Sequence, residues 1–276
     1  FTHPQMGTVF RLVVYADSTV ADRAAREAFA RVDALNNCLS DYLPDSETNL
    51  LCKNAGTWTP VSDDLWNMLA ISKDFSKKTG GAFDVTVGPI TRLWRRARHR
   101  NELPSDADVK EASEKTGYQN IRMRRRGKKI LLRKQGMQLD FGGIAQGYAA
   151  DECLKILKNH GITRALADAG GDIALGDPPP GEEGWSVEVP GGMTKGPSGM
   201  IKGMTNCGIT TSGATYRYLE LNGVRYSHIV DPRTGRALTH RVLVTVQAPD
   251  AVTADVWATA LSVLGAEGWE NLKKKH

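Results

Sequence analysis

The chain has 276 residues, of which 41% are hydrophobic and 24% are charged, and its formal net charge is +5. These values are ordinary for a globular protein with a substantial core, and no apolar stretch is long enough for a membrane-spanning helix. Much of the positive charge lies in three runs, at residues 92–100, 122–129 and 273–275. Aromatic residues do not interleave with these runs as nucleic-acid stacking requires, so we expect solvated surface and no nucleic-acid partner. Whether the run at 92–100 docks a protein or acidic lipid stays open.

Cysteine spacing provides no evidence for a metal site or a disulfide scaffold. The four cysteines, Cys38, Cys52, Cys153 and Cys207, form no CxxC pair. Four cysteines in a chain of this length do not define a disulfide framework, and their pairing cannot be deduced from spacing.

The first half of the chain is predicted to be mainly helical. Residues 7–15 are rich in β-branched and aromatic residues, which predicts a strand. Apolar residues at helical spacing predict a helix over 21–39, and a second is expected over 62–79, with Ser62 as N-cap and Gly80 after its end. A short helix is expected over 105–114. Short strands follow between 119 and 139, separated by a turn at Arg126-Gly127.

The second half is predicted to be rich in strands. It opens with a helix over 144–159 that ends before Gly161. Asn222-Gly223 is typical of a two-residue hairpin turn, and Thr253 is expected to cap a last helix over 254–264. Strands are expected at 163–168, 172–175, 185–189, 199–204, 216–221, 224–230 and 241–248.

Helices early, strands late and no long linker predict an α+β fold. We expect a single domain over residues 1–276, with mixed or antiparallel sheets and helices packed on them.

A glycine turn before the helix at 144–159 is the first candidate site. Residues 139–151 read LDFGGIAQGYAAD, and we expect a strand to end at Asp140. Glycines allow close approach of backbone, and a helix N-terminus attracts phosphate. The same pattern also fits a tight turn whose glycines serve packing, and it matches neither GxGxxG nor a Walker A loop.

Three further segments carry polar groups of catalytic type. His228 near the end of a strand could act as a general base, although a lone histidine is more often structural. Asp255 and Thr259 share one helix face and offer hard oxygen ligands to Mg²⁺ or Ca²⁺, although each also fits an ordinary helical role. Residues 81–89, GAFDVTVGP, could line a pocket around Asp84 or form a core turn.

Taken together and in order, these segments resemble the ApbE family of flavin transferases. The resemblance rests on MGT at 6–8, SDY at 40–42, GAFDVTVGP at 81–89, DFGGIAQGYAAD at 140–151, GGDI at 170–173, TSG at 211–213, SHIVDPRTG at 227–235 and ADVWATA at 254–260. It therefore extends over nearly the whole chain.

The resemblance implies an Mg²⁺-dependent enzyme that takes FAD as substrate, transfers FMN to a threonine of an acceptor protein and releases AMP. Asp255, Thr259 and the backbone carbonyl of Gly143 would hold Mg²⁺, and His228 would take the proton from the acceptor threonine. The residues implied to contact FAD are Met6, Tyr42, Ala82, Phe83, Asp84, Asp140, Gln146 and Ile229.

The sequence departs from the family pattern at a few positions. Position 146 is Gln where many members carry Lys, so one positive contact to FAD is absent. Position 143 is Gly where others carry Ala, Ser or Thr, but a carbonyl ligand needs no side chain. Asp168-Ala169 stands before Gly170, where an Asn-containing stretch is commoner.

The resemblance also implies a partner and a location. The acceptor would be a flavoprotein, such as a subunit of a membrane redox complex, in an extracytoplasmic space. The chain begins at Phe1, so any signal or lipoprotein leader is either removed or not included. By resemblance, we expect a periplasmic protein that is membrane-anchored through a removed lipoprotein leader.

Other functions remain open at this point. An FAD pyrophosphatase would use the same sites but let water attack, and a flavin-binding protein would hold FAD without turnover. Residues 212–215 read SGAT, like the end of an acceptor sequence, so Thr215 is a candidate for self-modification, although Ile209 stands where acceptors carry Asp.

Overall fold

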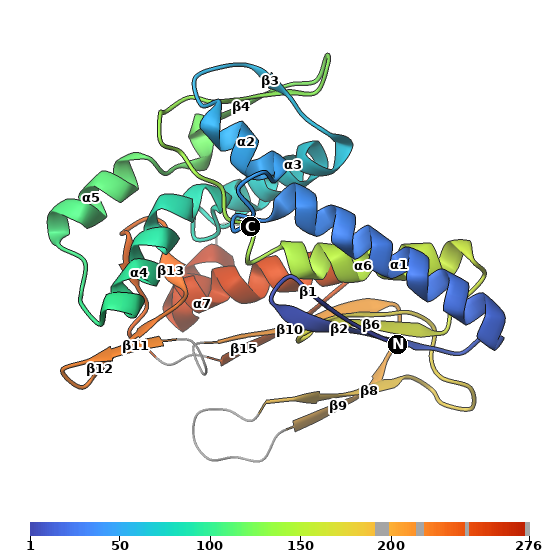
Figure 1. Ribbon diagram of the computed structural model, residues 1–276. Coiled ribbons are helices and arrows are strands. Elements are labelled where there is room, and N and C mark those ends of the chain that lie inside the picture. Colours follow the sequence, from blue (N-terminus) through green and yellow to red (C-terminus); the bar gives the residue numbers. More distant parts are fainter. Residues whose placement is uncertain (191–198, 214–217, 241–242, 274–276) are drawn as a thin grey trace. The chain divides into compact units, whose positions relative to one another are not determined.

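The computed structural model describes residues 1–190, 199–213, 218–240 and 243–273. The fold is α+β with antiparallel strand pairing, as predicted, and it divides into two compact units (Figure 1). Unit 1 comprises Phe1–Asn36, Gly142–Ser212 and Leu243–Ala258, and unit 2 comprises Asn37–Phe141, Gly213–Val242 and Thr259–His276. That residues 1–276 form one domain stays a prediction. Thr215 lies outside the described residues.

Unit 1 is built on a six-stranded sheet in the order β1-β2-β6-β7-β10-β15. The pairs from β1 to β10 are antiparallel, and α6 packs against β6 and β7 (Figure 1). A separate β8–β9 hairpin contributes to an apolar cluster around Trp185 and Ile209. The elements are β1 (Thr2–Gln5), β2 (Thr8–Val14), α1 (Ser18–Leu39), α6 (Ala145–Asn159), β6 (Ala165–Ala169), β7 (Asp172–Leu175), β8 (Trp185–Val189), β9 (Gly199–Met204), β10 (Cys207–Gly213), β15 (Leu243–Ala248) and the start of α7 (Ala251–Lys273).

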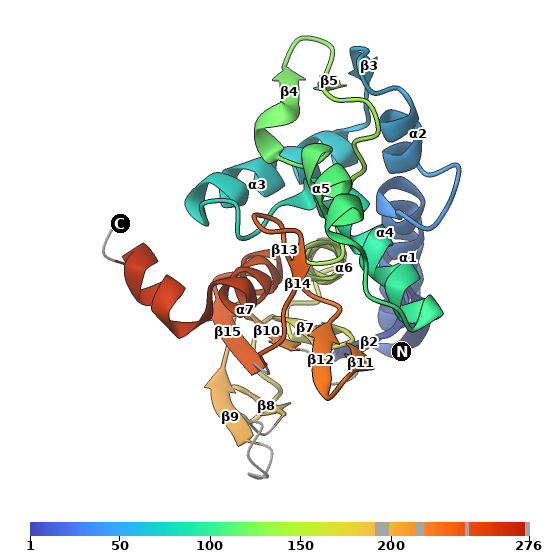
Figure 2. The same cartoon turned by 90° about the vertical axis from the view of Figure 1, so that its left-hand side faces the viewer.

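Unit 2 contains the remaining helices and several small sheets, one of them in the order β3-β5-β4. The helices α3, α4 and α5 are seen from a second side in Figure 2. The elements are α2 (Glu47–Lys53), β3 (Thr59–Pro60), α3 (Asp63–Lys78), η1 (Val85–Val87), α4 (Gly88–Arg100), α5 (Asp106–Glu114), η2 (Tyr118–Asn120), β4 (Ile121–Arg124), β5 (Lys129–Leu132), β11 (Tyr218–Leu221), β12 (Val224–Ser227), β13 (Val230–Asp231) and β14 (Arg236–Ala237).

Most predicted helix and hairpin signals are confirmed. The Ser62 side chain accepts a hydrogen bond from the Leu65 N–H and so caps α3. α6 ends at Asn159, and Gly161 follows with a φ of +79°. Asn222 and Gly223 have φ values of +51° and +75° and join β11 to β12.

Other expectations are wrong, each for a local reason. α7 begins at Ala251 and is not capped by Thr253, because the carboxylates of Asp250 and Asp151 accept the first free N–H groups of the helix. The strand expected over 224–230 breaks after Ser227, whose side chain accepts a hydrogen bond from the N–H of Ile229. β5 ends at Leu132, so Asp140 lies in an irregular segment and not at the end of a strand.

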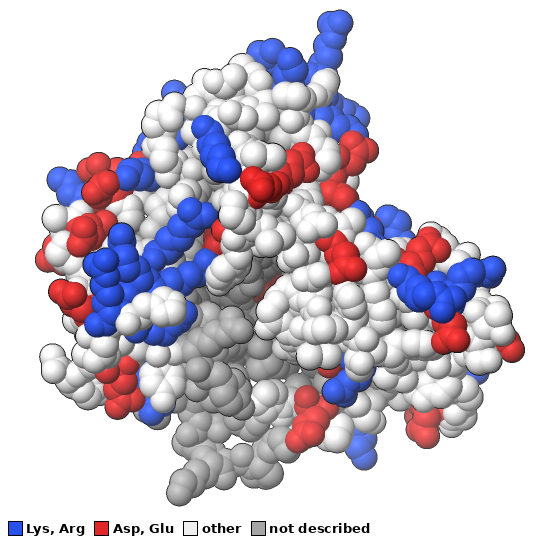
Figure 3. Space-filling model, in the orientation of Figure 1, with Lys and Arg blue, Asp and Glu red and all other residues white. Residues whose placement is uncertain are grey.

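Helix α4 was not predicted from the sequence, although it carries the basic run at 92–100. Its buried face is formed by Ile90, Leu93, Trp94 and Ala97, at the i, i+3, i+4 and i+7 spacing of an amphipathic helix. These side chains belong to the apolar cluster of unit 2, and the Trp94 indole N–H donates to the carbonyl of Gly235 at 2.9 Å. The basic residues occupy the rest of the helix surface, and Figure 3 shows Lys and Arg side chains gathered over α4.

Within the described part of the chain, no helix combines the length and apolar character required to cross a membrane.

Candidate active site

In unit 1 the predicted glycine turn leads into α6 as expected. Gly143 is half-buried, and the helix begins at Ala145 after Ile144, whose side chain makes no capping hydrogen bond. The first N–H groups of α6 therefore depend on partners outside the helix. One of them is identified, because the N–H of Gly147 donates to Asp255 Oδ2 at 3.2 Å.

Gly147 also sets how closely α6 and α7 approach. A Cβ at position 147 would lie 2.5 Å from the carbonyl oxygen of Ala251 and 2.9 Å from Asp255 Cβ. Real Cβ atoms do not tolerate such contacts with backbone. The missing side chain thus allows the first turn of α7 to place the Asp255 carboxylate against α6.

Asp255 is one of three carboxyl groups held away from water in unit 1. Its own pKa is raised well above the usual value by burial and then by repulsion from Asp172. Burial raises the pKa of Asp172 to about 6, against the effect of a hydrogen bond with the hydroxyl of Thr210, its cross-strand neighbour. Burial also raises the pKa of Asp151 to about 6, against the effect of hydrogen bonds from the N–H groups that open α7.

This arrangement fits a bound cation. Ionised carboxylates in a buried position are expensive unless a positive charge or hydrogen-bond donors compensate them. Among the described residues, the Asp255 carboxylate accepts a hydrogen bond from one donor, the Gly147 N–H, and Asp172 is a neighbouring carboxylate that repels it. Among the described residues no three His, Cys, Asp or Glu side chains are arranged to hold a metal ion. The predicted ligand set needs only one such side chain, Asp255, because its other members are a hydroxyl and a backbone carbonyl.

Two of the predicted FAD contacts in unit 1 touch each other. The side-chain amide of Gln146 donates to the backbone carbonyl of Met6 at 3.2 Å. Met6 and Gly7 form the two-residue turn between β1 and β2, with φ values of +51° and +73°. Such turns favour Asn or Gly at the first position, and a side chain with a Cβ costs about 1–2 kcal/mol there. Met6 is therefore held in a backbone conformation that its own chemistry disfavours.

In unit 2 the predicted pocket segment around Asp84 is largely buried. The Asp84 carboxylate accepts hydrogen bonds from the Thr86 N–H, the Thr86 hydroxyl and the Tyr118 N–H, at 2.7 to 2.8 Å. Burial raises the pKa of Asp84, and these hydrogen bonds oppose that effect. Ala82 and Phe83 are 1% and 4% exposed, so neither side chain offers much surface to a ligand. The Asp84 side chain holds the 81–89 segment in place.

Tyr42 and Asp140, two other predicted FAD contacts, are linked through Arg95. One guanidinium nitrogen of Arg95 pairs with Asp41 and the other donates to Asp140 Oδ2 at 2.8 Å. The Arg95 Cζ lies 4.5 Å from the centre of the Tyr42 ring. Tyr42 itself is 71% exposed, whereas the Asp41 and Asp140 side chains are 8% and 7% exposed. The network thus joins an exposed aromatic ring to a buried pair of carboxylates.

His228 and Ile229 lie together between β12 and β13. His228 is exposed, as a base that meets a macromolecular substrate must be. The backbone of Ile229 is fixed on both sides, because its N–H donates to the Ser227 hydroxyl and its carbonyl accepts from the Leu238 N–H.

The half-buried Thr259 lies four residues after Asp255 on α7, within unit 2 by the division given above.

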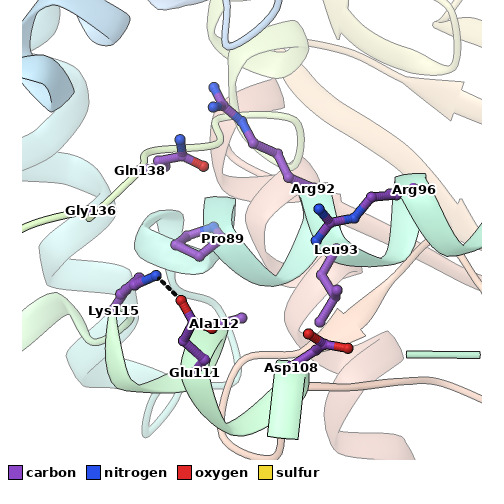
Figure 4. Close-up of a pocket in the computed structure, with 10 residues that line it drawn as sticks. All are labelled: Pro89, Arg92, Leu93, Arg96, Asp108, Glu111, Ala112, Lys115, Gly136 and Gln138. Atoms are coloured by element: carbon purple, nitrogen blue, oxygen red, sulfur yellow. Dashed lines mark hydrogen bonds and ion pairs between the residues drawn. The ribbon is translucent and has the colours of Figure 1, made fainter. Parts of the chain in front are cut away.

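A cavity of about 410 Å³ also occurs in unit 2, between α4 and α5, and none of the predicted site residues lines it (Figure 4). Its lining includes Arg92, Arg96, Lys115 and Glu111. Lys115 pairs with Glu111 at 2.6 Å, so part of the charge is already compensated within the cavity. Arg92 lines the cavity and also donates to the backbone carbonyl of Asp41, so the cavity adjoins the Arg95 network.

Sequence reasoning missed three residues that the structure makes prominent: Gly147, Asp172 and Arg95. Gly147 and Asp172 lie inside motifs that carry the resemblance, at 140–151 and 170–173, but no role follows from their spacing. Arg95 was read as part of a basic surface run. The buried spacing of Ile90, Leu93 and Trp94 would have shown that the run is one side of a helix.

Comparison with known proteins decides the family. The sequence model of the ApbE family matches residues 6–276. The chain belongs to the ApbE family. It is 33% identical over 272 residues to a protein of Salmonella typhimurium named FAD:protein FMN transferase, a match covering 95% of this chain and 77% of that protein. A protein of Treponema pallidum with the same name is 34% identical over 281 residues, with the same coverage.

Solved structures of ApbE proteins share the fold. The ApbE protein of Thermotoga maritima matches 99% of this chain and 88% of its own, with a TM-score of 0.90 and 28% identity. The apo form of the Pseudomonas stutzeri flavinyl transferase ApbE matches 100% of this chain and 87% of its own, with a TM-score of 0.87 and 30% identity. The predicted fold class and family are thereby confirmed.

Proposed function

We propose that this chain is an FAD:protein FMN transferase, which moves the FMN half of FAD to a threonine of an acceptor flavoprotein and releases AMP. The observation that carries the proposal is the match over 95% of the chain to proteins of that name. The chemistry of unit 1 supports it, because a buried, weakly compensated carboxylate at Asp255 beside a helix N-terminus suits a cation and a phosphate.

The proposed metal is Mg²⁺, held by the Asp255 carboxylate, the Thr259 hydroxyl and the Gly143 carbonyl. These are hard oxygen donors of the kind that Mg²⁺ prefers, and they leave room for water and phosphate oxygens. When bound, the ion neutralises charge on the diphosphate and on the departing phosphate of AMP.

The chain's own residues supply positioning and proton transfer. His228 takes the proton from the acceptor threonine hydroxyl as its oxygen attacks the phosphorus on the FMN side of the diphosphate. A phosphoester bond to threonine forms, and the bond from that phosphorus to the bridging oxygen breaks. AMP leaves with that oxygen and its negative charge. Gly147 orients the Asp255 carboxylate through its N–H.

The proposed contacts to FAD fall into two kinds. Tyr42 offers an exposed ring for stacking, and Asp140 offers a buried carboxylate beside it. Asp84 acts indirectly, because its carboxylate is already used by donors of the chain. The full proposed set is Met6, Tyr42, Ala82, Phe83, Asp84, Asp140, Gln146 and Ile229.

We further propose an extracytoplasmic, periplasmic location, with a lipoprotein leader as membrane anchor, and a membrane redox-complex subunit as acceptor. Finding the mature protein in a membrane fraction that a lipoprotein-processing inhibitor depletes would support this. Recovery in the cytoplasm would contradict it.

The experiment is an assay of AMP release and peptide mass with FAD, with and without Mg²⁺. The acceptor peptide ends in Ser-Gly-Ala-Thr and carries Asp six residues before the threonine, and a second peptide has Ala in place of that threonine. Asp255→Ala is compared with Glu267→Ala, which removes an exposed carboxylate from the part of α7 that follows the non-helical Gly265. We expect FMN on the threonine peptide only, with Mg²⁺ only, in wild type and Glu267→Ala but not in Asp255→Ala.

Other outcomes assign the protein differently. Release of AMP and free FMN at the same rate without acceptor would make it an FAD pyrophosphatase. Tight FAD binding with no product under any condition would make it a flavin-binding protein. A mass increase equal to FMN on the protein itself, lost in Thr215→Ala, would show self-modification.

A further inference from the structure

The side chain of Arg95 connects an exposed part and a buried part of the flavin site proposed in unit 2. Its guanidinium spans two carboxylates, Asp41 and Asp140, and lies over the ring of Tyr42. It is held in this position because its backbone belongs to α4, whose opposite face is anchored in the apolar cluster of unit 2.

The charge balance of this network depends on Arg95. The Asp41 and Asp140 side chains are both buried, and Arg95 forms an ion pair with each of them. Burial and repulsion from Asp140 raise the pKa of Asp41, whereas Arg95 lowers it. Arg92 contributes less, because its Nη2 donates to the backbone carbonyl of Asp41 and to the side chain of Asn49. Without the Arg95 guanidinium, both buried carboxylates would lose the cation that their two ion pairs share.

The geometry also fixes the ring of Tyr42. An arginine over the face of an aromatic ring is an attractive contact, and here the guanidinium is immobilised by two carboxylates. The Tyr42 side chain, 71% exposed, would otherwise be free to rotate in solvent. A ring supported on one side and open to solvent is a preorganised stacking surface for a flat aromatic group.

We propose that Arg95 is a positioning residue of the flavin site, which fixes the Tyr42 ring as a stacking surface and holds the Asp140 carboxylate in place beside it. This inference rests on the proposed function, since it takes the flat group to be the isoalloxazine ring of FAD. Arg95 makes no contact with the reacting phosphorus in this assignment. Its effect is therefore on the binding of FAD more than on the chemical step.

A lysine at position 95 should preserve only part of the effect of the arginine. A guanidinium is planar, donates to two carboxylates at once and stacks on a ring, whereas an ammonium is a compact point charge. Arg95→Lys is expected to keep a positive charge near Asp140 but to lose most of the support for the Tyr42 ring.

The test measures FAD binding through quenching of flavin fluorescence, which reports stacking on Tyr42, together with KM and kcat for AMP release. We expect Arg95→Met to weaken FAD binding and raise KM about tenfold, with kcat changed less than about threefold. Quenching of bound flavin should fall. Arg96→Met is the matched control, because it removes the same charge from the next position of α4, where the side chain is exposed. It should leave affinity and quenching within about twofold of wild type.

A second variant separates the two effects and guards against a folding defect. In Arg95→Met/Asp41→Asn the neighbouring carboxylate is removed together with the guanidinium, so Asp140 no longer faces an unpaired buried carboxylate and the network is less strained. We expect affinity to recover in part, while quenching stays low because the Tyr42 ring still lacks support.

Three results would overturn the inference. The first is wild-type FAD affinity and normal quenching in Arg95→Met. The second is a loss of FAD affinity in Arg96→Met as large as that in Arg95→Met. The third is an FAD affinity of Arg95→Met/Asp41→Asn no higher than that of Arg95→Met. If wild type itself neither binds FAD nor releases AMP, the proposed function fails as well, which distinguishes that failure from one confined to Arg95.

Discussion

Replacing Gly147 by alanine tests the link between helix packing and the proposed metal site. The added Cβ would lie 2.5 Å from the carbonyl oxygen of Ala251 and 2.9 Å from Asp255 Cβ. The first of these atoms is backbone at the start of α7, so no side-chain rotation relieves the clash. Forcing an extra carbon into a packed interior costs about 3 kcal/mol at the upper end, and alanine recovers about 1 kcal/mol through its higher helix propensity.

The net loss of about 2 kcal/mol should lower the Tm by about 5 °C for a chain of this size. The shift of α7 also lengthens the hydrogen bond from the Gly147 N–H to Asp255, which is 3.2 Å in wild type. Hydrogen bonds to charged groups contribute about 1.5–3 kcal/mol, so Mg²⁺-dependent AMP release should fall by at least about tenfold.

The assays are differential scanning fluorimetry and AMP release at saturating FAD over a series of Mg²⁺ concentrations. Gly199→Ala is the matched control, because among the described residues a Cβ there would meet only Val189 Cγ2, at 3.4 Å. It should change stability by no more than about 0.5 kcal/mol and leave activity unchanged. A Gly147→Ala protein with wild-type Tm and wild-type Mg²⁺ dependence would refute the reasoning about α6 and α7.

Three further predictions concern charge and packing. Asp255→Asn should raise the Tm in metal-free buffer, because it removes an acid whose charged form is destabilised by burial and by a neighbouring carboxylate. The same variant should abolish any rise in Tm that Mg²⁺ gives wild type. Melting curves with and without EDTA check both results. Burial raises the pKa of Asp151 from 3.8 to about 6. The folded protein therefore binds this proton more tightly than the unfolded chain does, and the contribution of Asp151 to stability falls as the pH rises from about 4 to about 6. Urea unfolding should therefore show wild type losing about 2 kcal/mol more than Asp151→Ala between pH 4.5 and 7, and equal losses would contradict this. Trp94→Phe leaves the buried Gly235 carbonyl without its donor and should cost about 1–3 kcal/mol in the same assay, whereas Trp269→Phe, at an exposed position, should cost less than about 0.5.

Local signals in the sequence predicted the elements whose ends are set by neighbouring residues. Ser62 caps α3 through its own side chain, and Asn222-Gly223 sets the β11–β12 turn, so both are visible within a few residues. α7 differs because its first N–H groups bind the carboxylate of Asp151, which lies 100 residues earlier in the chain. No window of sequence contains that pairing, and Thr253 was chosen as the cap instead.

The candidate site divides in the same way. Asp255 and Tyr42 are polar or aromatic residues inside ordered motifs, so sequence could single them out. The role of Gly147 depends on how near another helix comes, and that of Arg95 on two carboxylates that lie 54 and 45 residues away in the chain. Such roles exist only after folding brings the partners together. The assignments of His228, Thr259 and the FAD contacts stay predictions until the assays above are made.

The left-handed backbone at Met6 has a consequence for how this protein responds to selection. Asparagine or glycine at position 6 would relieve the turn between β1 and β2, so a library screened only for heat resistance should exchange Met6 early. A library screened for flavin transfer should keep Met6 if its side chain contacts FAD, although replacing it would stabilise the fold by the same amount. The frequency of methionine at this one position after each screen would therefore measure directly how much stability the chain gives up for its activity.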